Sequence, residues 1–255
     1  METSKIQSES QLNTSKFGFY ISMITTIIAV VTFAIAISTP PMSGPFCTGP
    51  CFEYPYADIA SRFPRDYYWM YPAIVLSFFY LIMMSCIYQI AHSSKKVFAM
   101  VGISFATMSA LILSVDYFVQ VSVIQPSLLA GETEGIALLS QFNPHGIFIV
   151  LEEIGFSLMI ISFFALFPIF HGKNSLEKAI RYTAVIGFIL AIVSFALVSI
   201  IHGIHREYLF EVIIISITWI ELIVLGILFT RYFKRLIRQI SQFNSPVLAD
   251  IYKPV

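Results

Sequence analysis

Residues 212–230 read VIIISITWIELIVLGILFT and contain one charged side chain, that of Glu221. A helix needs about 20 mostly apolar residues to cross about 30 Å of hydrocarbon, and this stretch meets that requirement. Five earlier stretches resemble it, and none alternates apolar and polar residues as a membrane β-strand does. The sequence therefore predicts an all-α, polytopic membrane protein with six transmembrane helices in a single bundle, at residues 17–37, 71–91, 97–121, 146–170, 182–201 and 209–230.

The composition of the chain favours the same fold class. Of its 255 residues, 57% are hydrophobic and 12% are charged. A soluble globular protein carries about 25% charged residues, so this chain has too little polar surface to dissolve a globule of its size. A lipid bilayer is therefore the first partner that we expect. The formal net charge is zero, which argues against nucleic-acid binding.

The first predicted span resembles a signal peptide, because lysines precede it and Ala34-Ile35-Ala36 looks like a cleavage site. Its apolar core is longer than the roughly 7–15 residues of a signal sequence, so we expect a retained helix. The chain then divides into an N-terminal segment (1–16), a transmembrane domain (17–232) and a basic C-terminal tail (233–255).

The positive residues predict the orientation of the bundle, since they concentrate on the cytoplasmic side of membrane proteins. Six spans place both termini and two loops on one side, with twelve Lys and Arg residues against three on the other. Both termini are therefore predicted to be cytoplasmic, in the cell membrane if the chain is prokaryotic. The twelve are Lys5, Lys16, Lys95, Lys96, Lys173, Lys178, Arg181, Arg231, Lys234, Arg235, Arg238 and Lys253; the three are Arg62, Arg65 and Arg206.

The loop at 38–70 is predicted to lie outside the cell as a cap on the membrane surface. It holds six of the twelve prolines, which oppose regular structure, and many aromatic residues, which suit the headgroup layer. We expect one short helical turn in it, around Ala57–Arg62. Cys47 and Cys51 are too few to enclose a zinc ion, and an oxidising exterior favours a disulfide between them.

Glu221 is the deepest charge in the predicted bundle. Nine uncharged residues precede it and nine follow, which places it about 14 Å from either end of the run. No predicted span carries a lysine or arginine in its core, so this acid has no intramembrane counter-cation. Two readings follow: a neutral acid that hydrogen-bonds a hydroxyl of another helix, or a site that holds a proton or cation.

Asp116 follows Glu221 in depth. Ser109, Asp116 and Gln120 fall at i, i+7 and i+11, which is one stripe of a helix that must face other helices or a water-filled cavity. Glu152 and Glu153 come third. Because neighbouring helix positions point about 100° apart, at most one of the two is expected to face the same cavity as Asp116. An interfacial position is the alternative for all three acids.

The histidines lie near the predicted membrane boundaries. His202 and His205 are three residues apart and would present two metal ligands if the helix continued there, with His145 as a third. A solvated loop pair is the simpler interpretation, so we expect no cofactor and keep a metal as the weaker alternative. The C-terminal cations recur at helical spacing and predict contact with anionic lipid. They are Arg231, Lys234, Arg235 and Arg238.

Three functions fit these features. The first is a proton- or cation-linked transporter whose embedded acids line a path between helices. The second is a non-catalytic membrane subunit or assembly factor, in which the acids pack helices or a partner subunit or second copy together. The third is a metal-dependent enzyme acting on lipid at the outer leaflet. No known enzyme motif appears in the sequence, so we favour a protein that is not an enzyme.

Overall fold

The computed structural model describes residues 2–172, 174–206 and 208–243. Lys173, Lys253 and the part of the predicted tail beyond residue 243 lie outside the described residues. The described residues form helices, turns and loops but no strand, and six of the helices are long and apolar enough to cross a membrane. This confirms the predicted helical class and the prediction of six helices with the length and composition of membrane spans. The six are α1 (Glu2–Ser38), α2 (Met70–Ile90), α3 (Lys96–Val119), α6 (Ile147–Phe164), α7 (Ser175–His202) and α8 (Tyr208–Phe243).

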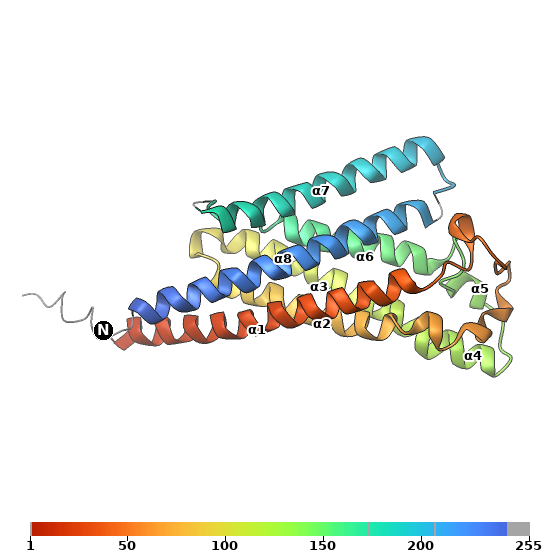
Figure 1. Cartoon of the computed structure of the whole chain (residues 1–255), viewed down its shortest axis with the longest axis horizontal. Coiled ribbons are helices and arrows are strands. Elements are labelled where there is room, and N and C mark those ends of the chain that lie inside the picture. Colours follow the sequence, from red (N-terminus) through yellow and green to blue (C-terminus); the bar gives the residue numbers. More distant parts are fainter. Residues whose placement is uncertain (1, 173, 207, 244–255) are drawn as a thin grey trace, which may run out of the picture.

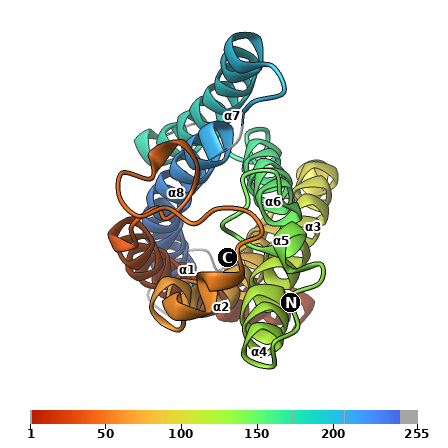
Figure 2. The same ribbon diagram turned by 90° about the vertical axis from the view of Figure 1, so that its right-hand side faces the viewer.

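Five of these helices form a closed ring. Helix α1 packs on α2, α2 on α3, α3 on α6, α6 on α8, and α8 returns to α1. Helix α7 stands outside the ring against α6 and α8, and Figure 1 shows it along one edge of the bundle. One end of the bundle carries the 39–69 loop and the short helices α4 (Gln125–Leu129) and α5 (Ile136–Leu139). We call it the loop end, and it faces the viewer in Figure 2.

Small residues allow these helices to approach closely. A Cβ at Gly226 of α8 would overlap the side chain of Thr26 on α1, and one at Gly155 of α6 would overlap Leu113 on α3. Membrane helices gain no hydrophobic free energy from leaving lipid, so such close van der Waals packing is a main source of their association. Ser109 of the predicted polar stripe adds a hydrogen bond, because its hydroxyl donates to the Gly155 carbonyl at 2.7 Å.

Two helices depart from their predicted spans near a proline. Helix α6 ends at Phe164 rather than at residue 170, because Pro168 disfavours helical conformation in the residue before it and lacks an N–H. The chain stays helical beyond residue 121, where the span that includes α3 was predicted to end. It continues through a π-helical turn, Gln120–Ile124, into α4 (Gln125–Leu129), since Pro126 sits in the first turn of α4, where it is tolerated.

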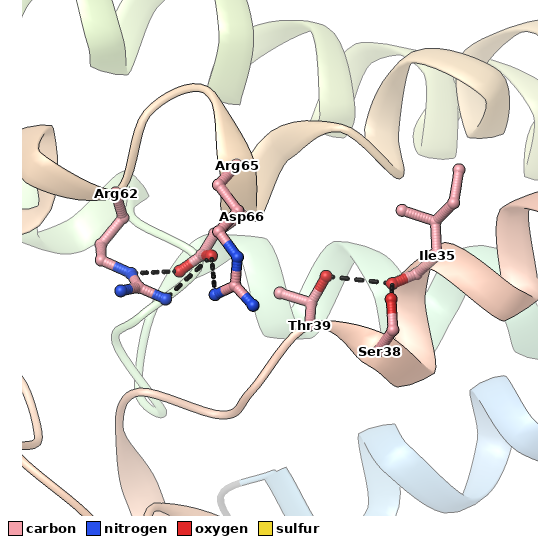
Figure 3. Close-up of polar contacts among 6 residues, drawn as sticks. All are labelled: Ile35, Ser38, Thr39, Arg62, Arg65 and Asp66. Carbon is pink, nitrogen blue, oxygen red and sulfur yellow. Dashed lines mark hydrogen bonds and ion pairs between the residues drawn. The ribbon is translucent and has the colours of Figure 1, made fainter.

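Helix α1 ends where the loop begins. The hydroxyls of Ser38 and Thr39 donate to the Ile35 carbonyl at 2.7 and 3.1 Å, and so satisfy an acceptor that the helix leaves free at its end (Figure 3).

The 39–69 loop caps the ring at the loop end. It contains three short 3₁₀ turns, η1 (Gly44–Phe46), η2 (Ala57–Arg62) and η3 (Arg65–Tyr67), of which η2 lies at the predicted position. A disulfide joins Cys47 to Cys51. The hydroxyls of Ser43 and Tyr208 hydrogen-bond at 2.8 Å, which ties the loop to the start of α8.

Candidate functional site

A cavity of about 210 Å³ lies at the loop end, beneath the capping loop. Its walls come from the end of α1, the loop itself, residues 141 and 142, and the first turns of α6 and α8. Exposed Pro40, Pro41 and Phe46 form part of its rim. The polar side chains that line it are Thr39, Ser43, Asp66, Gln141, Glu152, Tyr208 and Glu211.

Two buried carboxyl groups meet at this cavity. Glu152 of α6 is 1% exposed and Glu211 of α8 is 8% exposed, and their side chains lie within hydrogen-bonding reach of each other. The Tyr117 hydroxyl of α3 donates to Glu152 Oε1 at 2.8 Å. Carboxylates only accept hydrogen bonds, so a bond between the two acids requires at least one proton on the pair. Two acids arranged in this way can hold a proton, or another cation in its place, between them.

Asp116 lies next to this pair without lining the cavity. It is 2% exposed, interacts electrostatically with both Glu152 and Glu211, and leaves its Oδ2 atom without a hydrogen-bond partner. Three helices, α3, α6 and α8, thus bring three acids together. Because three acids lie close together in a buried region, binding a positive charge there is electrostatically more favourable than beside a single acid.

Asp66 is the one acid at the cavity that has cationic partners. Arg62 donates to it through Nε at 2.7 Å and through Nη2 at 3.1 Å, and Arg65 Nη1 approaches at 3.5 Å (Figure 3). The bidentate geometry of Arg62 suits a carboxylate. These two arginines come close to the cavity but bind Asp66, and no Lys or Arg of the described residues is among the side chains that line it.

Aromatic rings close the cavity toward the opposite end of the bundle. The rings of Trp69 and Trp219 lie 6.4 Å apart between centroids, and Tyr117 packs on Trp69 at 5.1 Å. Phe33 and Phe156 contact Trp219 from α1 and α6, at 5.3 and 6.4 Å. Past this layer lies a mostly apolar space of about 10 Å³, which has room for about one water molecule and is too small to continue the cavity as an aqueous path.

Glu221 does not join this site. It follows Glu211 by ten residues on α8, which corresponds to about 15 Å along the helix axis. Its carboxyl group lies against Gly187 of α7, where an added Cβ would overlap it. It is 3% exposed, both of its oxygens lack hydrogen-bond partners, and it borders an apolar groove of about 450 Å³ between α7 and α8.

The other predicted acid and the predicted amide have structural partners. Glu153 points away from Glu152 and approaches Arg206 at 3.6 Å, beside α7. Gln120 is fully buried, where its Nε2 donates to the Leu139 carbonyl at 2.7 Å and its Oε1 accepts from the Gln141 N–H at 3.1 Å. Gln120 thus holds the 130–146 segment against the end of α3.

The predicted metal ligands are not brought together. His145, His202 and His205 are exposed, and in the described part of the chain no three His, Cys, Asp or Glu side chains are placed to hold a metal ion. The cations predicted to meet lipid are exposed side chains along the last turns of α8. These are Arg231, Lys234, Arg235 and Arg238.

Sequence reasoning missed Glu211, Tyr117, Asp66 and both tryptophans as site residues. Glu211 is the third residue of the last predicted span and reads as an interfacial charge. Its burial depends on the loop, which Ser43 attaches to the start of α8 from 165 residues away. A weak signal did exist, because Glu211 lies on a span that already carries one buried acid. No family model, curated protein or solved structure matches this chain, so its function has to be inferred from the site itself.

Proposed function

We propose that this chain is a proton- or cation-linked membrane carrier, and that the cavity at the loop end is its external cation site. The observation that supports the proposal most directly is the buried Glu152–Glu211 pair in a cavity that no Lys or Arg of the described residues lines. In this proposal the loop end faces outward and both termini are cytoplasmic, because twelve of the fifteen Lys and Arg residues then lie inside.

The shared proton is the exchangeable element of the proposed mechanism. A cation that enters the cavity takes the place of the proton on the Glu152–Glu211 pair, and the proton leaves to water. Charge then stays balanced in a region of low dielectric constant, where an uncompensated charge costs several kcal/mol. Asp66 takes no part in the exchange, because Arg62 and Arg65 already neutralise it.

The described arrangement corresponds to one state of a carrier cycle. The layer of Trp69, Trp219 and Phe156 separates the cavity from the opposite end of the bundle. Release on the cytoplasmic side requires a second state in which this layer parts, and the bound cation has to stabilise the two states differently.

Proton flux in proteoliposomes tests the proposal. We expect an external amine or alkali cation to drive proton movement, reported by a pH-sensitive dye inside the vesicles. Glu152→Gln and Glu211→Gln should abolish the response, because each removes one of the two acids that share the exchangeable proton. Glu132→Gln, at an exposed loop position, is the matched control. A response of wild-type size in both cavity variants would refute the carrier assignment.

The outer surface of α7 and α8 favours a second candidate, a membrane subunit that binds another membrane protein. Glu221 has no partner there, and α7 lies outside the ring. A partner helix with a hydroxyl or amide group would satisfy the carboxyl group. This candidate predicts that a partner or a second copy of the chain co-purifies with the wild-type protein and no longer co-purifies with the Glu221→Leu variant. The exposed cations at the end of α8 are proposed to contact anionic lipid in either case.

A further inference from the structure

We propose that the cavity at the loop end takes a small organic ammonium ion, a protonated amine with a short apolar body, in preference to an inorganic cation. This inference names the substrate class of the carrier site and so rests on the proposed function above. It is carried by the aromatic rings that surround the Glu152–Glu211 pair, by the size of the cavity and by the lack of a preformed set of metal ligands.

The cavity offers too few oxygen ligands in a fixed geometry for a metal ion. Calcium takes six to eight oxygen ligands and magnesium requires a near-octahedral set. In the described residues no group of three acids or histidines is positioned as a metal-binding set. A space of about 210 Å³ is also much larger than a bare ion, which would keep most of its water there.

The walls suit an ammonium group instead. Six aromatic side chains line the cavity, among them Trp69, Trp219 and Tyr208, and the face of such a ring attracts a cation within about 6 Å of its centre. Tryptophan is the most effective of the aromatic residues in this role. Because the 39–69 loop, the segment before α6 and two helices supply these rings, the aromatic lining forms only when these parts of the chain come together.

The acids and the apolar side chains of the cavity contact different parts of the proposed ligand. Glu152 and Glu211 accept hydrogen bonds from the N–H groups of a protonated amine, and these charge-assisted bonds are roughly twice as strong as neutral ones. Phe148, Ile149 and Ile215 line the same cavity and offer apolar contact to a short alkyl or aryl body. A neutral alcohol would lose the charge interaction, and an anion would meet two acids with no free cation to receive it.

The chain provides its own reporter of binding. Its sequence contains two tryptophans, and both line the cavity, so the tryptophan fluorescence of the chain reports on this site. The experiment titrates the full chain in nanodiscs with butylammonium, and in parallel with butanol, butyrate and sodium at matched ionic strength. We expect a saturable change with butylammonium, and no saturation with the other three over the same range.

Variants locate the binding site. Glu211→Gln should weaken butylammonium binding at least about tenfold, the usual loss for one charged hydrogen bond, and Glu152→Gln should do the same. Glu132→Gln should bind as the wild type does. The ligand comparison uses wild-type protein, so it stands even if a cavity variant does not fold. Saturation by butanol equal to that by butylammonium, or unchanged affinity in both folded cavity variants, would overturn the inference.

The outcomes separate this inference from the carrier proposal. Saturable butylammonium binding without any proton flux would end the carrier assignment and leave the organic-cation site in place. Proton flux driven by sodium or potassium and lost in Glu211→Gln, with no butylammonium binding, would support the carrier and refute the ammonium assignment.

Discussion

Helix α8 carries two buried acids ten residues apart whose surroundings differ in almost every respect. Glu211 lies inside the ring, beside a second carboxyl group and a cavity with aromatic walls. Glu221 lies outside the ring, against Gly187 of α7, with both oxygens unpaired. Depth in an apolar segment ranks Glu221 first, but polar groups from other helices gather around Glu211. Depth in an apolar segment therefore does not predict which embedded acid meets the polar groups of other helices.

Lysine at the two positions should give the largest contrast. Glu221→Lys places a cation in an apolar groove with no acid beside it, and a lone charge at the centre of a membrane helix costs about 3 kcal/mol or more. Glu211→Lys places the same cation beside Glu152 and Asp116, which can pair with it. We expect Glu221→Lys to lose most of its folded protein and Glu211→Lys to stay folded without cation binding.

Size-exclusion chromatography of detergent extracts measures this contrast, with Glu132→Lys as the exposed control. Equal yields of monodisperse protein from the two buried variants would contradict this expectation. They would show that a lysine costs the same stability at position 211 as at position 221.

The contact between Glu221 and Gly187 predicts an effect of intermediate size. Gly187→Ala adds a Cβ where the carboxyl group lies, and overpacking of this kind costs about 1–3 kcal/mol. In a Glu221→Ala background the added Cβ no longer overlaps a carboxyl group. The Gly187→Ala change should then stabilise α7 by up to about 1 kcal/mol, because alanine has a higher helix propensity than glycine. The sign of the Gly187→Ala effect should therefore depend on residue 221.

Thermal unfolding of the two single variants and the double variant measures this coupling as a cycle. Gly49→Ala is the control, because an added Cβ there meets no atom within 4 Å. Additive effects in the cycle would show that the carboxyl group of Glu221 does not lie on Gly187.

The spans could be predicted from sequence because a membrane crossing is a local property of about 20 consecutive residues. The end of α6 differs from the prediction because the apolar run continues to residue 170, whereas the backbone chemistry of Pro168 ends the helix earlier. The cavity could not be predicted. Its acids come from the loop, α6 and α8, and its tryptophans precede α2 and lie in α8. The loop that covers it contacts α8 through Ser43 and Tyr208. These are contacts between helices, which no local pattern encodes.

The smallest predicted effect on stability is that of Glu221→Gln. An amide has nearly the shape of a protonated carboxyl group and keeps both a donor and an acceptor, so if Glu221 is a neutral packing acid the change should cost less than about 1 kcal/mol. Cation-driven proton flux should persist, because Glu221 lies outside the cavity. Glu211→Gln is the matched change on the same helix, and it should abolish that flux while the protein stays folded. Thermal unfolding and dye-reported flux on the same preparations measure both quantities. Loss of flux in Glu221→Gln would mean that the groove beside α7 belongs to the conduction path, and that the two acids of α8 act together.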